Sequence, residues 1–252
     1  MYLFIFYCLS LFFLLYLLYK KYYPSIIPIV SIDGNIGVGK STFTEMLKDY
    51  FNSKVIHEPI DEWCDIKDSY GRNILQMYYT DKHRWAYAFQ NMAYITRMEK
   101  LVEAQKNSRC DIIFTDRSLE TDKNVFAKMC FDNKYMNELE WNIYNHWSNF
   151  YNKIFSHKQK KNIIYLRASP KVCYERIQKR GRDEEKDISF EYIQTLHTYH
   201  EDWLVGNTTD NVLILDCNAD FENSIYNMDY LVDDVKDFLN KNKLHFNKIE
   251  EK

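Results

Sequence analysis

The sequence contains the stretch Gly34-Asn35-Ile36-Gly37-Val38-Gly39-Lys40-Ser41, followed by Thr42, which matches the phosphate-binding loop pattern G-x-x-x-x-G-K-[ST]. The apolar run Ile27–Ile32 before it predicts a buried strand, and Thr42–Phe51 after it predicts a helix. In this context a glycine-rich backbone turns its N–H groups toward phosphates, and the helix adds its positive N-terminal end. We therefore expect the loop to bind a nucleotide, with Lys40 on the outer phosphates and Ser41 as a ligand of Mg²⁺.

The chain around this loop alternates short apolar runs with longer periodic ones, which is typical of an α/β domain with a parallel sheet. The predicted strands are Ile27–Ile32, Lys54–His57, Asp111–Thr115, Asn162–Leu166 and Asn211–Leu215. The predicted helices are Thr42–Phe51, Arg84–Lys106, Asn137–Phe155, Pro170–Lys179, Ser189–Leu204 and Ile225–Leu239. We expect one catalytic domain over residues 24–241 and a polar tail over residues 242–252.

Composition narrows the class of partner. A chain of 252 residues with 46% hydrophobic content can bury a full core. Its formal net charge of −3 gives no electrostatic case for nucleic-acid binding, so a small phosphorylated ligand is the better partner. The 6 cysteines include no C-x-x-C pair, so the sequence indicates neither a zinc site nor a disulfide framework. The bulk of the chain is therefore expected to face a reducing compartment.

The N-terminus differs from the rest. Residues 2–19 carry no charge and are long enough as a helix to cross the hydrocarbon core of a bilayer. No basic residue precedes this run, whereas Lys20 and Lys21 follow it, which favours a membrane anchor over a cleaved signal peptide and a cytosolic catalytic domain. We expect residues 1–23 to form this anchor. An interfacial helix, or upstream sequence absent from the working protein, remains an alternative.

Three polar stretches follow predicted strands, where a parallel sheet places its catalytic groups. Glu58-Pro59 offers a carboxylate that can accept a proton from a hydroxyl. Asp116-Arg117-Ser118 offers a carboxylate for Mg²⁺ and a guanidinium for an oxyanion. The third stretch is basic, with Arg176, Lys179, Arg180 and Arg182 followed by Asp183-Glu184-Glu185. Such arginines can neutralise the charge of a migrating phosphoryl group.

In this order the motifs resemble those of the deoxynucleoside kinases, in particular the deoxycytidine/deoxyguanosine kinase group, from about Ile29 to Leu239. The matching stretches are Gly34–Thr42, Glu58-Pro59 with Trp63, Leu75-Gln76-Met77 with Tyr79, Arg84-Trp85, Phe89-Gln90, Asp116-Arg117-Ser118 with Asp122 and Phe126-Ala127, Arg180–Glu185, and Leu196-His197 with His200-Glu201 and Trp203-Leu204. The resemblance implies a P-loop kinase fold, with a five-stranded parallel sheet wrapped by helices and a homodimer formed through a helix pair. It also implies ATP-dependent 5′-phosphorylation of deoxynucleosides in nucleotide salvage.

The resemblance assigns roles to individual residues. Glu58 resembles the general base, Arg117 the arginine that holds the 5′-hydroxyl and the base, and Lys40 the lysine of the phosphate loop. For the nucleoside, Gln90 would bond the nucleobase edge, Trp63 would line its pocket, and Tyr79 and Glu185 would hold the 3′-hydroxyl. For the donor, the loop residues Gly34, Asn35, Ile36, Gly37, Val38, Gly39, Lys40, Ser41 and Thr42 would act with Arg176, Arg180 and Arg182 of the lid and with Asp220 and Phe221 beside the donor's base.

Metal binding carries the first departure from the family. Ser41 and Asp116 are the expected Mg²⁺ ligands, although the family usually has Glu where Asp116 stands. Asp is shorter by one methylene, so its contact with the metal can run through water. The N-terminal apolar stretch is the second departure, because it has no counterpart in the family's catalytic unit.

Substrate choice is expected to rest on Arg97 and Asp122. If Arg84–Lys106 is one helix, Arg97 lies seven residues, or two turns, beyond Gln90, so both side chains point into one pocket. In the family, Arg and Asp at these positions, with a small residue at Ala93, mark members that take deoxycytidine or purine deoxynucleosides rather than thymidine. A charged pair there fills the space of a thymine methyl group and can bond an exocyclic amine.

Other classes share part of this pattern. A GTPase switch protein would need an Asn-Lys-x-Asp guanine motif, which the sequence lacks. A catalytically dead membrane scaffold would be expected to have lost Lys40, Glu58 or the lid arginines, and all are present. A nucleoside monophosphate kinase shares loop, sheet and lid, but it needs a basic clamp for the acceptor's phosphate, whereas Glu58, Tyr79 and Gln90 suit a neutral nucleoside.

Overall fold

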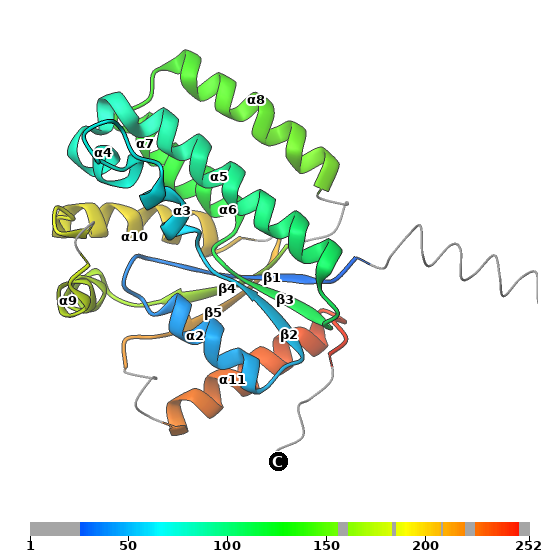
Figure 1. Cartoon of the computed structure of the whole chain (residues 1–252). Helices are drawn as coiled ribbons and strands as arrows, with labels where there is room; N and C mark the ends of the chain where they lie inside the picture. The colour runs from blue at the N-terminus through cyan, green and yellow to red at the C-terminus, as the bar shows by residue number, and fades with distance from the viewer. Residues whose placement is uncertain (1–25, 156–160, 183–184, 208, 220–224, 247–252) are drawn as a thin grey trace, which may run out of the picture.

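The computed structural model describes residues 26–155, 161–182, 185–207, 209–219 and 225–246 (Figure 1). The predicted anchor over residues 1–23 lies outside the described residues, as do Asp183, Glu184, Asp220 and Phe221. Among the helices that are described, none is both long enough and apolar enough to span a membrane.

One five-stranded sheet forms the centre of the fold, with every strand parallel to its neighbours in the order β2-β3-β1-β4-β5. Its strands are β1 (Ile29–Gly34), β2 (Ser53–Ile56), β3 (Ile112–Asp116), β4 (Asn162–Arg167) and β5 (Asn211–Asp216). All five residues of β3 are buried, as expected for a parallel sheet covered on both faces. The predicted α/β architecture with a five-stranded parallel sheet is therefore confirmed.

Helices cover both faces of this sheet. The longer ones are α2 (Lys40–Met46), α5 (Lys82–Asn107), α8 (Glu138–Phe155), α9 (Pro170–Arg180), α10 (Phe190–Leu204) and α11 (Ile225–Lys241). In Figure 1, α2 and α11 lie below the sheet, α5 and α10 lie above it, and α8 packs outside α5. Because β1 pairs with β3 on one side and β4 on the other, the loop after β1 leaves the middle of the sheet, where α/β proteins bind their ligands.

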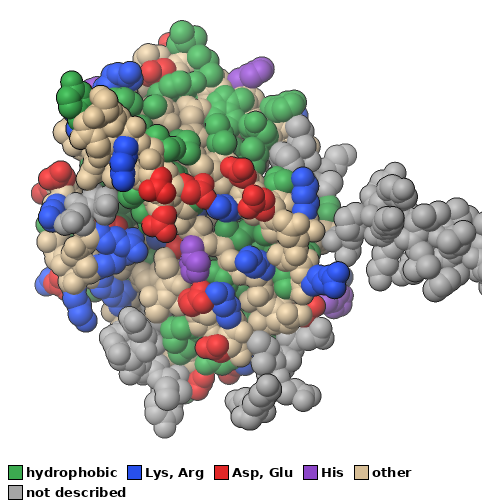
Figure 2. Space-filling model, in the orientation of Figure 1, with side chains coloured by type: hydrophobic (Ala, Val, Ile, Leu, Met, Phe, Trp, Pro, Cys, Tyr) green, Lys and Arg blue, Asp and Glu red, His purple; other side chains and the backbone are tan. Residues whose placement is uncertain are grey.

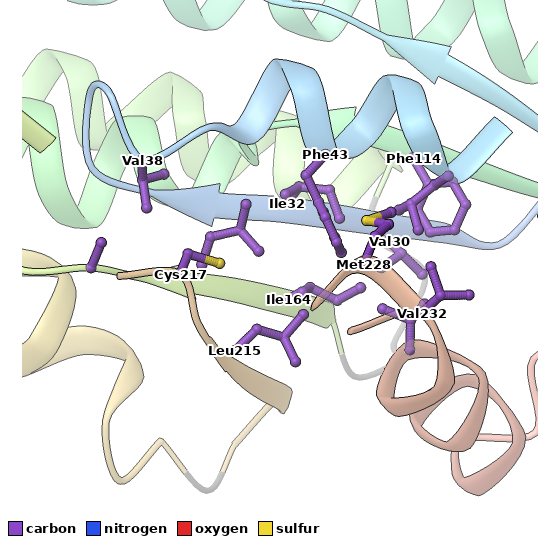
Figure 3. Close-up of a cluster of buried hydrophobic side chains, with 14 of the residues drawn as sticks. Val30, Ile32, Val38, Phe43, Phe114, Ile164, Leu215, Cys217, Met228 and Val232 are labelled. Carbon is purple, nitrogen blue, oxygen red and sulfur yellow. The ribbon is translucent and has the colours of Figure 1, made fainter. Parts of the chain in front are cut away.

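The lower core joins the sheet to α2 and α11. Figure 3 shows Ile32 and Ile164 of the sheet against Phe43 of α2 and Val232 of α11, and all of these side chains are fully buried. Burying each such side chain stabilises the fold by about 1.5–3 kcal/mol. This cluster anchors α2. It therefore also fixes the N-terminus of α2, where the phosphate loop ends.

The upper core is rich in aromatic rings. Tyr94 of α5 meets Tyr144 and Trp147 of α8 edge to face, with ring centroids 6.0 and 5.3 Å apart. Tyr78, from the short helix α4 (Ile74–Thr80), stacks on Phe89 of α5 at 4.6 Å. This cluster holds α5 in place above the sheet and so fixes the wall of the candidate site that α5 supplies.

Short elements in the connections depart from the predictions. The predicted helix Thr42–Phe51 begins two residues earlier, at Lys40, and after Met46 continues as a tighter turn, η1 (Leu47–Asp49). Two short helices, α3 (Ile60–Asp65) and α4, were not predicted. Asp122, which we expected in the loop after Asp116-Arg117-Ser118, instead starts a π-helical segment, η2 (Asp122–Ala127), between α6 (Leu119–Thr121) and α7 (Lys128–Asp132). Ser118 nucleates these turns by capping α6, where its hydroxyl accepts from the Thr121 N–H.

Candidate active site

The phosphate loop curls between β1 and α2, and its glycines are required by close packing. Gly37 has φ +79°, and a Cβ there would lie 2.3 Å from the Cys173 carbonyl oxygen of α9. Gly39 caps α2 with φ +106°. Only glycine adopts these conformations at little cost, so the loop backbone can pass directly over α9 and the start of α2. The glycines of the predicted loop therefore lie where the backbone requires them, and phosphate binding by the loop stays a prediction.

Lys40 is buried inside the curl of the loop. Its Nζ donates to the Asn35 carbonyl oxygen at 2.9 Å. Burial, together with the nearby charge of Arg117, lowers the pKa of Lys40 to about 8. The ammonium group is still mostly protonated at neutral pH, and an anion in the loop would raise this pKa further. Lys40 thus places a cation inside the curl of the loop, as its predicted role requires.

Ser41 and Asp116 meet at the mouth of the loop. The Ser41 hydroxyl donates to Asp116 Oδ2 at 2.5 Å, and Asp116 Oδ1 is buried without a hydrogen-bond partner in the described structure. A buried carboxylate oxygen left unpaired costs free energy unless a cation or water meets it. A hydroxyl beside a carboxylate is also a ligand set that Mg²⁺ accepts. The residues present therefore fit a magnesium ion that keeps most of its other ligands as water and phosphate oxygens.

Arg117 occupies a strained position directly after β3. Its φ is +70°, in the left-handed region that non-glycine residues rarely adopt. Its Nη1 donates to the Gly34 carbonyl oxygen at 2.7 Å, its Nε donates to Glu58 Oε1 at 2.9 Å, and the guanidinium lies 4.7 Å from the centre of the Phe126 ring. These contacts hold the strained turn and link the phosphate loop to the end of β2.

Glu58, just beyond β2, is clamped by two guanidinium groups. Its Oε1 accepts from Arg117 and also from Arg97 Nη2 at 3.1 Å. Burial alone would raise the pKa of this carboxyl, but the positive charges of Arg117 and Arg97 outweigh burial and lower it to about 2. Glu58 is therefore an ionised carboxylate, and no described residue donates to its second oxygen, Oε2. A carboxylate placed in this way can accept a proton.

Arg97 joins Glu58 to Asp122 inside the protein. Its Nε lies 2.9 Å from Asp122 Oδ2, its Nη1 donates to the Asp116 carbonyl oxygen at 2.7 Å, and its side chain is 3% exposed. Burial raises the pKa of Asp122, while the charge of Arg97 acts in the opposite direction. Arg97 and Asp122 line a cavity that the phosphate-loop residues Lys40 and Ser41 also line. Gln90 lines it too, as expected from its spacing of two helical turns from Arg97 on α5.

One wall of the cavity is aromatic with few polar groups. Trp63, Phe89 and Tyr79 line it, and the Trp63 indole N–H donates to Thr96 at 3.0 Å. Gln90 is 1% exposed, yet its side-chain amide bonds to no described residue. An unpaired amide in an aromatic slot is suited to a planar ligand with both donors and acceptors on its edge.

The lid arginines divide into two groups. Arg180 and Arg182 line the cavity, and Arg180 forms a bidentate pair with Glu185. Arg176 instead donates to the backbone carbonyl oxygens of Val38 and Cys217, both at 3.0 Å. In this structure Arg176 braces the phosphate loop from behind, so its predicted contact with phosphates stays a prediction.

The predicted residues fall into three groups by position. Those lining the candidate-site cavity are Ile36, Gly37, Gly39, Lys40, Ser41, Thr42, Glu58, Trp63, Tyr79, Gln90, Arg97, Arg117, Asp122, Arg180, Arg182 and Glu185. Those supporting it from outside are Gly34, Asn35, Val38, Asp116 and Arg176. Asp220 and Phe221 lie outside the described residues.

Some lining residues were not assigned a role from the sequence. Ile60, Leu75, Phe89 and Phe126 contribute apolar surface to the cavity. Phe89-Gln90 and Phe126-Ala127 were part of the resemblance, but nothing in their spacing marks them as pocket residues. For Phe89, a usable signal is that it lies four residues, or about one helical turn, before Ala93, which also lines the cavity.

The deciding comparison is with protein families. The model of the family described as deoxynucleoside kinase matches residues 30–240. The chain belongs to the deoxynucleoside kinase family. It is 39% identical over 241 residues to deoxycytidine kinase 2 of Gallus gallus, covering 83% of this chain and 89% of that protein.

Two further relatives are similar to this chain over a comparable share of their length. The chain is 35% identical over 241 residues to deoxycytidine kinase of Homo sapiens, covering 83% of this chain and 90% of that protein. It is 34% identical over 235 residues to the mitochondrial deoxyguanosine kinase of Xenopus laevis, covering 83% of this chain and 89% of that protein. The predicted family is therefore confirmed.

Proposed function

We propose that this family member transfers the γ-phosphoryl group of ATP to the 5′-hydroxyl of a deoxynucleoside, a step of nucleotide salvage that supplies DNA precursors. One observation carries this proposal: Glu58 lies in the same cavity as the phosphate loop and an aromatic slot in which the Gln90 amide bonds to none of the described residues. The loop accounts for a nucleoside triphosphate, the slot for a planar base, and the carboxylate for a hydroxyl to be activated.

The reaction follows from these positions. The loop N–H groups, Lys40, Arg180 and Arg182 hold the donor so that its γ-phosphorus faces the 5′-oxygen in line. Glu58 takes the hydroxyl proton as the oxygen–phosphorus bond forms and the bond to the bridging oxygen of ADP breaks. Mg²⁺, held by Ser41 and Asp116, would supply charge neutralisation on the phosphate oxygens. Positioning and charge neutralisation account for most of the acceleration.

Substrate preference is proposed to come from the Arg97–Asp122 pair. The pair fills the far side of the slot with a donor and an acceptor, so an exocyclic amine can bond Asp122 while a thymine methyl group meets charged groups. A base that leaves buried charged groups unpaired is strongly disfavoured. We therefore expect deoxycytidine, deoxyadenosine or deoxyguanosine to be better acceptors than thymidine.

The test measures kcat/KM for each of the four deoxynucleosides separately, with ATP and Mg²⁺, on residues 24–252. For the double variant Arg97→Met with Asp122→Ala, the ratio of thymidine to deoxycytidine activity should rise about tenfold or more, because both charged groups that disfavour the thymine methyl group are removed. The matched control is Lys100→Met with Glu62→Ala, a half-exposed ion pair of 2.5 Å that also joins α5 to α3. The control should leave the ratio unchanged, and a wild-type chain that works best on thymidine would contradict the assignment.

A homodimer is proposed to form through α5 and α8. Figure 2 shows hydrophobic side chains over the upper part of the molecule, where Figure 1 places these helices. Ile95, Leu139, Ile143 and Phe150 of the two helices are 43%, 69%, 43% and 56% exposed. A second copy would cover such a patch. Light scattering on residues 24–252 should give the mass of two chains, and Phe150→Glu should lower it.

The N-terminal segment is proposed to tether this catalytic domain to a membrane from the cytosolic side. The support is the uncharged run at residues 2–19 followed by Lys20 and Lys21. Carbonate extraction of the full-length chain should leave it with the membrane fraction, and release by carbonate would contradict a spanning anchor.

A further inference from the structure

Lys82, the first residue of α5, lies in a cage of three tyrosine rings. Its Nζ is 5.2 Å from the ring centroid of Tyr192 and 5.7 Å from those of Tyr78 and Tyr79. The rings come from α4 and α10, so the ammonium group ties three helices together at one point. Each distance is within the 6 Å over which a cation is attracted to an aromatic face.

The position of Lys82 on its helix makes this cage more informative. A lysine at the first turn faces the positive end of the helix dipole, which is unfavourable for a cation. No described carboxylate forms an ion pair with it, and partial burial lowers its pKa. The more distant charge of Asp187 favours the ammonium group, and the three rings are the groups that contact it directly.

The tyrosines of the cage also hold one another. The Tyr78 and Tyr192 hydroxyls are 3.2 Å apart, and the rings of Tyr79 and Tyr192 meet edge to face at 6.3 Å. The rings of Tyr78 and Tyr79 are 5.3 Å apart. Lys82 lies against all of them, so its removal would loosen the contact between α4 and α10.

Tyr79 connects this cage to the candidate site. Its side chain lines the cavity, and its hydroxyl bonds to no side chain or backbone group within the described chain. Burial, and then the charge of Glu185, raises the pKa of this hydroxyl well above its usual range. The hydroxyl therefore stays protonated and can donate or accept a hydrogen bond, but nothing except packing fixes where it points.

We propose that Lys82 is a positioning residue that acts through Tyr79: by holding the Tyr79 ring against Tyr78 and Tyr192, it places the Tyr79 hydroxyl for the 3′-hydroxyl of the acceptor. This inference rests on the proposed function and adds a residue that does not line the cavity. It assigns Lys82 an effect that depends on whether the acceptor carries a 3′-hydroxyl.

The test compares the preferred deoxynucleoside with its 2′,3′-dideoxy counterpart. Lys82→Met keeps the length and apolar stem of the side chain and removes the charge. Its kcat/KM should fall about 3- to 10-fold on the deoxynucleoside and less than about 2-fold on the dideoxynucleoside, which has no group for Tyr79 to hold. Lys82→Arg keeps the cation and should restore activity to within about 2-fold of the wild type.

Three further variants complete the experiment. Tyr79→Phe should lose activity on the deoxynucleoside alone, and Tyr192→Leu, which removes one wall of the cage, should reproduce the pattern of Lys82→Met. Tyr192→Phe keeps the ring and removes only the hydroxyl that lies 3.2 Å from the Tyr78 hydroxyl, so it should lose less activity than Tyr192→Leu. Equal losses of Lys82→Met on both acceptors, or no loss on either, would overturn the role of Lys82. A wild-type chain that phosphorylates neither nucleoside would overturn the proposed function and this role with it.

Discussion

Replacing Lys40 with alanine should abolish nearly all phosphoryl transfer, lowering kcat by about 10³-fold or more while the fold remains intact. Lys40 is the one loop side chain that can place a full positive charge on the transferring phosphoryl group. Among the described residues, its Nζ donates to the Asn35 carbonyl oxygen alone, at 2.9 Å, so it can change partner when phosphates arrive. A steady-state assay with ATP and the preferred deoxynucleoside measures the loss.

Stability is not expected to suffer from this substitution. Removing a buried cation whose pKa is already lowered to about 8 by burial and by Arg117 relieves repulsion inside the loop. The melting temperature of Lys40→Ala should therefore match or exceed that of the wild type. The control is Lys48→Ala in η1, a half-exposed lysine paired with Glu45, which should keep full activity. Turnover retained by Lys40→Ala would contradict the assignment of this loop to phosphoryl transfer.

The predicted strands agree with the structure because their signal is local. A strand buried on both faces of a parallel sheet is mostly apolar, as in Ile112-Ile113-Phe114, and polar residues such as Thr115 and Asp116 come toward its carboxyl end. The long helices were also predicted from a local signal, the periodic spacing of their apolar residues. The C-terminal ends of α5 and α10 lie within one residue of the predicted ends. The order of the strands in the sheet, in contrast, is set by packing over the whole chain, and no single stretch of sequence encodes it.

Short connecting elements were missed because their stability comes from caps and tertiary contacts. Helix α4 has only 7 residues, too few for a periodic pattern. Its signal was a capping box, in which Asn73 accepts from the Gln76 N–H at 2.8 Å and the Gln76 side chain accepts from the Asn73 N–H at 3.2 Å. The π-helical turn at Asp122 has no such local code.

The sequence predicts some contacts of the candidate site and not others. The phosphate loop follows from its own sequence, because glycine positions and a lysine define it. The pairing of Arg97 with Asp122 was expected from the sequence. The further bond of Arg97 to Glu58 was not, since these two residues come from different elements and meet only after the sheet has formed. The cage around Lys82 was missed for the same reason, because two of its rings lie before α5 and the third lies on α10.

Replacing Glu58 with glutamine should lower kcat by about 10²-fold or more and leave KM for the nucleoside within a few-fold. Glutamine keeps the length of the side chain and can still accept from Arg97 and Arg117 through its amide oxygen. It has no carboxylate to take the proton. The matched control is Glu62→Gln, four residues further along and half-exposed beside Lys100, which should leave both constants unchanged.

The acid side of the pH profile gives a second readout of the same carboxylate. The pKa of Glu58 is lowered from 4.5 to about 2 because the charges of Arg117 and Arg97 outweigh its burial. A lowered pKa means that Glu58 is ionised at every pH well above 2, so its ionisation should not limit kcat/KM between about pH 4 and 8. Its contribution to stability is present in full above about pH 4.5 and is lost as the pH falls toward 2. Loss of nucleoside binding with kcat intact in Glu58→Gln would make Glu58 a binding residue, because a base that takes the proton during bond formation acts on kcat.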